Sequence, residues 1–181
     1  MKPGFALSKE DRMEFTSRGY CPTYGELTKK GVHKMLKNID VYNKMFVDLG
    51  SGTGNVVKNI WSVSGGWKRA VGIELSRERH EIALSCQKHM SNNNRSRTLF
   101  VHGDLFTYDL HDADIIYISN LCFSEDNNKK LGRKIDIECR PDTIIFTSKH
   151  IYLTVDHTLT SERVDQTWDK NSVLLKYTIL D

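Results

Sequence analysis

The sequence lacks the features that mark a secreted, membrane-spanning or disulfide-built protein. Its longest apolar runs, such as Ile115 to Ile118, are far too short to cross a bilayer. Residues 1–7 contain neither a long apolar stretch nor a small-residue cleavage site, so we expect no secretory signal. The cysteines are widely spaced, with no C-x-x-C pair, which argues against a zinc site and a disulfide scaffold. We therefore expect free thiols in a reducing, intracellular compartment, carried by Cys21, Cys86, Cys122 and Cys139.

Patterns typical of metal-dependent and hydrolytic enzymes are missing too. The seven histidines show no H-x-x-x-H or H-x-H spacing, so we expect no metal ion. No G-x-S-x-G elbow is present to support Ser-His-Asp hydrolysis. The chain also has no internal repeat and no low-complexity stretch, which argues against a repeat architecture and against wholesale disorder.

What the sequence does contain is typical of one globular unit. The 181 residues are 39% hydrophobic and 27% charged, and a chain of this length can bury a hydrophobic core large enough to be stable without disulfides or a metal ion. We expect residues 1–40 to form an N-terminal segment with a loop and a helix. Residues 41–181 are expected to form the main domain, and the two parts together make one folding unit.

The charge balance is mildly basic, with a net charge of +3 and a pI near 8.6. This balance permits an acidic partner without requiring one. Two local runs are more basic than the average and fit either a solvated helix face or an electrostatic contact with DNA or an acidic protein. They are Lys29, Lys30, His33, Lys34 and Lys37, and then Lys129, Lys130, Arg133 and Lys134.

Strand and helix patterns alternate along most of the chain. Short apolar runs predict strands at 45–49, 69–75, 98–101, 114–119 and 143–148, and helical spacing predicts helices at 28–39, 55–61, 76–90 and 125–135. The tail, residues 151–181, has the composition of two long strands in an antiparallel hairpin. This order predicts an α/β fold with a mostly parallel sheet and helices on both faces. A ligand would then bind at the carboxyl ends of the strands.

The sharpest local motif is residues 48–55, Asp-Leu-Gly-Ser-Gly-Thr-Gly-Asn, directly after a strand and at the start of a helix. Its G-x-G-x-G spacing misses the G-x-G-x-x-G fingerprint of dinucleotide sites. Asp48 at its mouth disfavours a pyrophosphate and suits a ligand amine. Glu74 ends the next strand, where a carboxylate can accept both ribose hydroxyls, and Asp104 follows the third strand, within reach of an adenine edge. Together these acids predict a pocket for S-adenosylmethionine of the class I methyltransferase type.

The segment 22–28, Pro-Thr-Tyr-Gly-Glu-Leu-Thr, resembles the Tyr-Gly-Glu loop of the Dot-one (disruptor of telomeric silencing) family. Those proteins are non-SET lysine methyltransferases that act on the nucleosome core. The family order continues to the end of the chain, and the Tyr-Gly-Glu loop combined with Asn120-x-x-Phe123 is its most specific part. The other resembling segments are 47–55, 72–74, 103–105, 115–123, 144–149 and 168–181.

The resemblance implies a class I methyltransferase fold of seven strands and a role for each matching residue. Tyr24, Gly25, Glu26 and Leu27 would form a lid over the cofactor. In the cofactor site the resemblance places Asp48 on the methionine amine, the backbone of Gly50, Gly52, Gly54 and Asn55 around its carboxylate, Glu74 on the ribose, and Asp104 with Leu105 or Phe106 on the adenine. Asn120 and Phe123 would line the catalytic channel together with Tyr24, and no general base is nominated.

Some positions depart from the family pattern. Ser119 stands in place of the first asparagine of the Asn-Asn pair, and Leu121 in place of the phenylalanine that follows. The aromatic residue of the last hairpin is not evident, since Leu174, Leu175 and Lys176 stand near its place, with Tyr177 one step away. These differences concern the acceptor side of the site and leave the cofactor side intact.

The resemblance implies a protein lysine N-methyltransferase that acts on a core histone of the nucleosome, in the nucleus. Two alternatives stay open. One is a class I methyltransferase with a non-histone protein or a nucleic acid as acceptor, although the Asp/Asn-Pro-Pro-Tyr signature of DNA amino-methyltransferases is absent. The other is a catalytically silent module that binds the cofactor and serves as an interaction partner.

Overall fold

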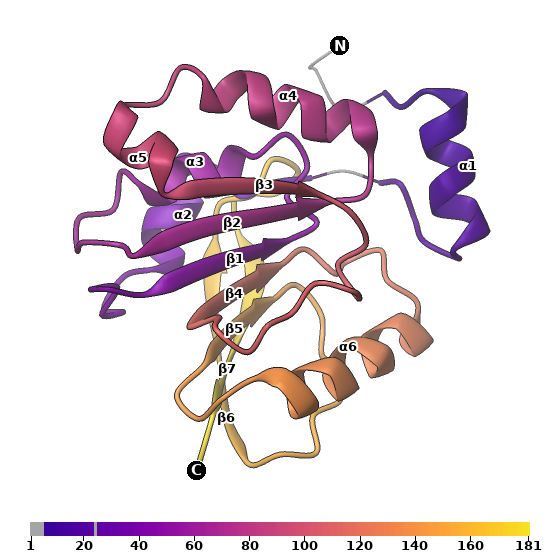
Figure 1. Ribbon diagram of the computed structural model, residues 1–181. Coiled ribbons are helices and arrows are strands. Elements are labelled where there is room, and N and C mark those ends of the chain that lie inside the picture. Colours follow the sequence, from indigo (N-terminus) through magenta and orange to yellow (C-terminus); the bar gives the residue numbers. More distant parts are fainter. Residues whose placement is uncertain (1–5, 24) are drawn as a thin grey trace.

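The protein folds around a single sheet of seven strands in the order β3-β2-β1-β4-β5-β7-β6 (Figure 1). The computed structural model describes residues 6–23 and 25–181. The first five strands in this order are parallel, and β7 runs antiparallel between β5 and β6. The strands are β1 (Met45–Leu49), β2 (Arg69–Glu74), β3 (Thr98–His102), β4 (Ile115–Ile118), β5 (Ile144–Thr147), β6 (His157–Val164) and β7 (Ser172–Ile179).

Helices cover both faces of the sheet, as the alternating pattern predicts (Figure 1). They are α1 (Lys9–Ser17), α2 (Lys29–Met35), α3 (Asn55–Ile60), α4 (Arg77–Gln87), α5 (Asn92–Ser96) and α6 (Glu125–Glu138). Phe46 and Tyr117 belong to the core on the face covered by α2, α3 and α4. Val47 and Ile116, their neighbours along the strands, belong to the core under α6. Strand β1 is therefore buried on both faces, which explains its continuous apolar sequence.

The helix starts follow local sequence signals. The hydroxyls of Thr28 and Ser76 accept hydrogen bonds from backbone N–H groups in the first turns of α2 and α4, so these two residues cap the helices that the sequence predicts to begin at residues 28 and 76. Helix α3 has no side-chain cap and begins instead at Gly54, whose φ is +78°. A Cβ on Gly54 would lie 2.5 Å from the Phe100 ring, so only glycine fits both the backbone and the space.

Two boundaries differ from the sequence-based expectation. The helix predicted at 76–90 ends at Gln87, and a short further helix, α5, begins at Asn92, because the Ser91 hydroxyl caps it by accepting from the Asn94 N–H. Helix α2 stops at Met35 rather than near residue 39, and Asn38 just beyond adopts a left-handed φ of +65°. Among the described residues, no helix is both long enough and apolar enough to span a membrane.

The N-terminal segment packs across the carboxyl ends of the strands. Asp11 of α1 is buried and accepts hydrogen bonds from the Ser76 hydroxyl and from the Glu78 N–H at the start of α4. Further along, Leu27 forms an isolated bridge with Gln166, and the Thr28 N–H donates to the Asp165 carbonyl. These contacts place the segment between α1 and α2 over the edge where a ligand is expected.

Candidate functional site

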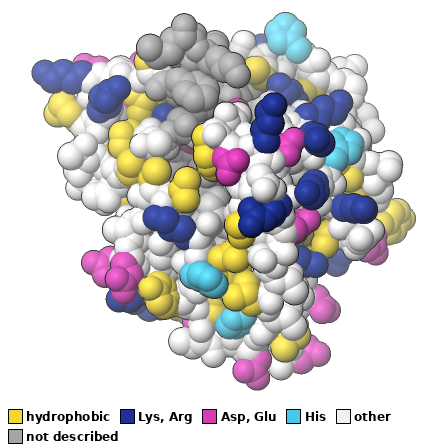
Figure 2. All heavy atoms as spheres, turned by 180° about the vertical axis from the view of Figure 1, so that it is seen from behind, with side chains coloured by type: hydrophobic (Ala, Val, Ile, Leu, Met, Phe, Trp, Pro, Cys, Tyr) yellow, Lys and Arg dark blue, Asp and Glu magenta, His cyan; other side chains and the backbone are white. Residues whose placement is uncertain are grey.

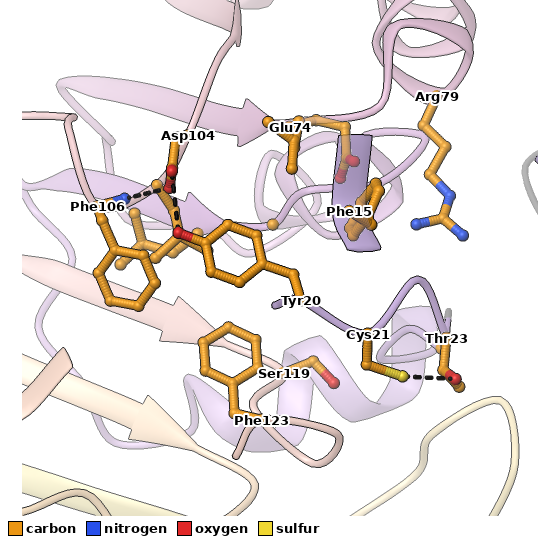
Figure 3. A pocket seen from close by; sticks show the side chains of 15 residues that line it. Phe15, Tyr20, Cys21, Thr23, Glu74, Arg79, Asp104, Phe106, Ser119 and Phe123 are labelled. Atoms are coloured by element: carbon orange, nitrogen blue, oxygen red, sulfur yellow. Dashed lines mark hydrogen bonds between the residues drawn. The ribbon is translucent and has the colours of Figure 1, made fainter. Parts of the chain in front are cut away.

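A cavity opens at the carboxyl ends of β1, β2 and β4, beneath the segment that joins α1 to α2 (Figure 3). It offers about 670 Å³ of space, counted out to its open mouth. The residues around it are Phe15, Tyr20, Cys21, Thr23, Gly25, Leu49, Gly50, Glu74, Leu75, Arg79, Asp104, Leu105, Phe106, Ser119 and Phe123. We call it the cofactor cavity.

The glycine motif forms one end of this cavity. Gly50, Gly52 and Gly54 have φ values of +88°, +53° and +78°, a conformation that glycine adopts without strain. Among the residues that the structure describes, none beyond the chain neighbours of Gly50 comes within 4 Å of the position that a Cβ would take there, so this turn presents its backbone to the cavity. The motif can therefore let a ligand approach the main chain.

Glu74 lies at the end of β2, almost fully buried, and lines the cavity. Its Oε2 accepts the Gly52 N–H at 2.8 Å and its Oε1 accepts the Ser76 N–H at 2.8 Å. Burial raises the pKa of this carboxyl, while the two backbone hydrogen bonds and the nearby Arg79 act in the opposite direction. The bonds fix the orientation of the carboxylate, and its remaining lone pairs are available to hydroxyl donors.

Asp48 is also buried, with 1% of its surface exposed, and it does not contribute to the cavity wall. Its Oδ1 has no hydrogen-bond partner within the described part of the chain. Burial raises the pKa of Asp48 well above its ordinary value, and the negative charges of Glu26 and Glu74 raise it further. An oxygen in this position is suited to an ammonium group, which would supply both a donor and the missing positive charge.

Asp104 is more heavily engaged than the sequence alone predicts. Its Oδ2 accepts from the Tyr20 hydroxyl at 2.9 Å, and its Oδ1 accepts from the Phe106 N–H at 2.9 Å (Figure 3). The Arg18 guanidinium also donates to Oδ2, at 3.1 Å. Burial raises the pKa of Tyr20 to about 12, and the hydrogen bond to Asp104 adds to this shift. Tyr20 therefore keeps its proton at neutral pH and donates a hydrogen bond to Asp104. The sequence analysis did not identify Arg18 or Tyr20 as partners of Asp104.

Three rings form an aromatic wall beside Asp104. The ring centroids of Tyr20 and Phe106 are 5.8 Å apart, and those of Phe106 and Phe123 are 6.4 Å apart. Leu105 and Phe106 both line the cavity, as does Phe123, so these three predicted residues are brought together. A planar ligand group such as a purine fits against a wall of this kind.

The predicted lid divides among different environments, and Tyr24 lies outside the described residues. Gly25 lines the cavity, and Glu26 accepts a hydrogen bond from the Thr53 hydroxyl at 3.1 Å. Leu27 is fully buried in the core, and its carbonyl accepts from the Asn55 side chain at 3.2 Å. Glu26 and Leu27 thus connect the segment to the glycine motif.

Asn120 occupies a different place from the one that the resemblance implies. It is fully buried, and it is absent from the wall of the cofactor cavity. Its amide nitrogen donates to Asn128 at 2.7 Å and to the Lys149 carbonyl at 3.1 Å, and its oxygen accepts from the Ser148 and Lys149 N–H groups at 2.8 Å each. The residue braces the ends of β4 and β5, while its neighbour Ser119 reaches the cavity.

A second cavity meets the first and leads away from it; we call it the side channel. It is lined by Thr23, Gly25, Ser119, Leu121, Cys122 and Trp168, and it shares Thr23, Gly25 and Ser119 with the cofactor cavity. Trp168 was not predicted as a site residue, because the aromatic side chain of the last hairpin was expected near residues 174–177. A Cβ on Gly25 would lie 2.0 Å from the Trp168 ring, so glycine is needed for the indole to sit there.

The two basic runs differ in the structure. Lys29, Lys30, Lys34 and Lys37 are all exposed on α2 and the residues after it, and Lys and Arg side chains gather on one part of the surface in Figure 2. The run on α6 is largely engaged. There the ammonium of Lys129 pairs with Glu125 at 2.6 Å, that of Lys130 lies 4.1 Å from the centre of the Phe106 ring, and that of the buried Lys134 pairs with Glu138 at 2.7 Å.

Comparisons with known proteins identify the fold and the family. An RNA methyltransferase from Salinibacter ruber, solved with S-adenosylhomocysteine, matches with a TM-score of 0.65 and 22% identity, covering 83% of this chain and 90% of that one. The glycopeptide N-methyltransferase MtfA, complexed with S-adenosylmethionine, matches with a TM-score of 0.61 and 11% identity over 83% of this chain and 93% of its own. The predicted class I methyltransferase fold is confirmed by these similarities.

Sequence comparison gives the family directly. An uncharacterised protein of Methanocaldococcus jannaschii is 34% identical over 91 residues, which are 50% of this chain and 36% of the relative. The chain thus matches about a third of the length of that curated relative. Residues 15–178 match the family described as histone methylation protein DOT1. This match spans the lid segment, the glycine motif and the last hairpin, and the chain belongs to the DOT1 family.

Proposed function

We propose that this protein transfers the methyl group of S-adenosylmethionine to the side-chain amine of a lysine, and that the lysine belongs to a core histone in the nucleosome. The observation that carries the proposal is the meeting of the two cavities at Thr23, Gly25 and Ser119. One cavity has buried acids and an aromatic wall, and the other has a largely apolar lining. A cofactor and a side chain that enters from outside could meet there.

The residues present fit S-adenosylmethionine group by group. Asp48 directly precedes Leu49 and Gly50 of the cavity wall, and its Oδ1, which has no partner among the described residues, suits the methionine ammonium. The open backbone at Gly50 suits the methionine carboxylate. Glu74 presents a carboxylate of fixed orientation for the ribose hydroxyls. The wall of Phe106 and its neighbours suits adenine, with Asp104 at its edge. When bound, this cofactor supplies an activated methyl group on a sulfonium.

The side channel can prepare an amine for methylation without a dedicated base. Methyl transfer requires a neutral amine in line with the methyl group, so alignment and removal of water account for most of the catalysis. Leu121, Cys122 and Trp168 give the channel largely apolar walls, and such surroundings lower the pKa of a lysine ammonium. The Trp168 face also attracts the ammonium before it loses its proton.

Asn120 acts as a positioning residue, because it contacts the backbone next to the site and not the site itself. Its four hydrogen bonds hold the ends of β4 and β5 together, and the backbone of β4 continues directly into Ser119 at the junction. Phe123, which follows, stands in the cavity wall against Phe106. We therefore assign alignment to the Ser119–Phe123 segment as a whole rather than to the Asn120 amide.

The exposed lysines of α2 and the following turn support a nucleosomal acceptor, and with it a nuclear location. Lys29, Lys34 and Lys37 extend from a surface that carries no matching run of acids along the same helix. DNA phosphates attract such a surface and release counterions on binding, so the contact weakens steeply with salt. Lys30 pairs at 3.5 Å with Asp165 and contributes less.

A nucleic-acid acceptor is the second candidate. It is favoured by the S. ruber RNA methyltransferase, whose chain is matched over 90% of its length, and by Ser119, where the family carries asparagine. The test for both is transfer of a labelled methyl group from S-adenosylmethionine to nucleosomes, free histones, RNA and DNA offered side by side. Label on a histone supports the proposal, and label on RNA alone overturns it in favour of the alternative.

A matched pair of variants controls this test. Trp168→Ala removes the aromatic wall of the side channel, whereas Tyr42→Ala removes a 73% exposed aromatic side chain from the loop before β1. Transfer should fall with the first variant and persist with the second. If both variants keep wild-type transfer, the acceptor does not enter through the side channel. If label appears on no acceptor while the cofactor still binds, the protein is a silent binding module.

A further inference from the structure

Two thiols from distant parts of the sequence lie together where the cavities meet. Cys21 belongs to the segment between α1 and α2 and lines the cofactor cavity, and Cys122 follows β4 and lines the side channel. Thr23 lines both cavities, and its hydroxyl lies 3.1 Å from the Cys21 sulfur (Figure 3). Thr23 and Cys122 line the side channel together, and the two thiols affect each other: Cys122 helps to lower the pKa of Cys21, and Cys21 helps to raise the pKa of Cys122.

Both thiols are accessible. Cys21 and Cys122 are exposed, whereas Cys86 and Cys139 are partly buried. The oxidation of a cysteine requires that a reagent reach its sulfur, so this pair is the first that an oxidant meets. Nothing in the methyl-transfer chemistry requires a thiol at either position, since the reaction needs only alignment and a dry channel.

The two thiols also differ in pKa, and the difference favours disulfide formation, because the more ionised thiol reacts first with the oxidant and its neighbour then attacks the oxidised sulfur. The hydrogen bond with Thr23 lowers the pKa of Cys21, whereas partial loss of water around the Cys122 sulfur and the neighbouring charge of Cys21 raise the pKa of Cys122. Cys21 therefore carries more of the reactive thiolate, and Cys122 remains a thiol beside it. Cys139 is less reactive than either, because burial raises its pKa to about 12.

We propose that Cys21 and Cys122 form a reversible intramolecular disulfide when the protein meets a peroxide, and that this bond closes the junction between the cofactor cavity and the side channel. The pair is a modification site on the surface of the protein. Its oxidant is hydrogen peroxide, and its reductant is a thiol such as glutathione or dithiothreitol.

The step balances in atoms and electrons. The Cys21 thiolate attacks one oxygen of the peroxide, the O–O bond breaks, and hydroxide leaves and takes up the proton that the thiol had lost. The resulting sulfenic acid of Cys21 is then attacked by the sulfur of Cys122, which releases water and forms the S–S bond. Two thiols are oxidised and one peroxide is reduced to two molecules of water.

The consequence follows from the place of the bond. It would tie the segment that roofs the cofactor cavity to the loop that forms the floor of the side channel, across Thr23 and beside Gly25 and Ser119. A bound cofactor could not leave by moving the roof, and an incoming side chain would meet the disulfide. The loss of methyl transfer rests on the proposed function, whereas the disulfide and the trapping of the cofactor do not.

The chemical test uses the full chain with Cys86→Ser and Cys139→Ser, so that only the proposed pair remains. After peroxide, digestion without reductant and mass spectrometry should yield one linked peptide pair, Cys21 with Cys122, from a monomer, and dithiothreitol should separate it. A further Cys122→Ser change should leave a sulfenic acid at Cys21 that dimedone traps. The absence of the linked pair, links only between molecules, or trapping of Cys122 in a Cys21→Ser chain would overturn the proposal.

The closure is tested by the release of bound S-adenosylhomocysteine, each oxidised protein being compared with its own reduced form. We expect the disulfide to slow release by about tenfold or more, because opening of a closure limits the release of a bound product. Chains that carry Cys122→Ser should show no change. If release is equally fast in the oxidised and reduced forms, the bond does not close the junction. A disulfide that slows release in a protein that methylates none of the acceptors would uphold this inference and reject the proposed function.

Discussion

Replacing Asp48 with asparagine should lower the affinity for the cofactor and raise the free energy of unfolding of the cofactor-free protein. Both effects have the same origin, the buried carboxylate oxygen. In the free protein, the Asp48 carboxylate is fully buried, its Oδ1 has no hydrogen-bond partner among residues 6–23 and 25–181, and the charges of Glu26 and Glu74 oppose its ionisation. An unsatisfied buried polar atom costs about 1–3 kcal/mol. The side-chain amide that Asp48→Asn introduces has the same shape as the carboxylate, carries no charge, and can donate toward the neighbouring carboxylates.

The expected gain in the free energy of unfolding is therefore about 1–3 kcal/mol at neutral pH without cofactor. Each kcal/mol raises the melting temperature of a protein of this size by about 2–4 °C. Binding should change in the other direction, because a hydrogen bond between a buried carboxylate and an ammonium contributes about 1.5–3 kcal/mol, or about 10- to 150-fold in affinity. Calorimetry with S-adenosylmethionine measures the second effect, and thermal unfolding measures the first.

The pH dependence of the free energy of unfolding gives an independent test of the Asp48 prediction. The pKa of Asp48 is higher in the folded protein than its ordinary value of 3.8, so the fold binds this proton more tightly than the unfolded chain does. The stabilising contribution of the protonated acid is complete below pH 3.8 and is lost as the pH rises through the raised pKa of the folded state. The stability advantage of Asp48→Asn should therefore grow over this window and then level off.

Asp114→Asn is the matched control. Asp114 accepts the Met45 N–H at 2.7 Å and pairs with Lys44 at 3.5 Å and Arg140 at 3.3 Å, at the opposite end of the strands from the cofactor cavity. Loss of its charge should destabilise the protein and leave cofactor affinity unchanged. The reasoning is refuted if Asp48→Asn is less stable than wild type at neutral pH and still binds the cofactor with wild-type affinity.

Three further substitutions separate the acceptor side, the brace and the glycine motif. Trp168→Ala should lower kcat/KM for the acceptor at least about tenfold while the cofactor Kd stays within about twofold, and Tyr42→Ala should change neither; binding and transfer assays on the same preparations decide this. Asn120→Ala leaves two backbone N–H groups without their acceptor and should cost about 2–5 kcal/mol in a denaturant titration, whereas a purely catalytic role would leave stability intact. Gly54→Ala should cost about 2–4 kcal/mol, since φ is +78° and the added methyl would lie 2.5 Å from Phe100; unaltered thermal unfolding would contradict the crowding.

The parts of the fold that could be predicted from the sequence are those that depend on neighbouring residues. The bounds of β1, Met45–Leu49, were predicted without error, because a strand buried on both faces is a continuous apolar run that ends at glycine. The caps at Thr28 and Ser76 likewise involve atoms within three residues. The acids at the ends of β1 and β2 follow from the topology, since parallel strands bring their carboxyl ends to one edge.

The parts that could not be predicted depend on contacts between distant segments. Trp168 faces Gly25 only because the turn between β6 and β7 folds back over the N-terminal segment. The spacing of apolar residues along the sequence does not reveal a contact of this kind. Tyr20 and Asp104 meet for the same reason. The one local sign was the position of Trp168 in a polar turn, among Thr, Asp, Lys and Asn, where a tryptophan is not needed for the hydrophobic core.

Asn120 illustrates a limit of reasoning by resemblance. A family motif identifies a residue type at a position, but the partners of that residue decide whether it acts on the ligand or on the fold. All four hydrogen bonds that the Asn120 amide forms are to Asn128 and to the Ser148–Lys149 backbone. The residue that reaches the junction is Ser119, and it departs from the family pattern. Acceptor choice is therefore more sensitive to position 119 than to position 120.

The stability of the free protein and its affinity for the cofactor have a common physical basis at Asp48. A buried acid without a cation lowers the stability of the free protein, and a ligand that carries an ammonium removes this penalty on binding. Part of the affinity for such a ligand therefore has its origin in the strain of the empty site, which Glu26 and Glu74 increase. The melting temperature of the wild type should for this reason rise more on addition of saturating cofactor than that of Asp48→Asn. Equal rises would place the origin of the affinity in the aromatic wall and the glycine backbone instead.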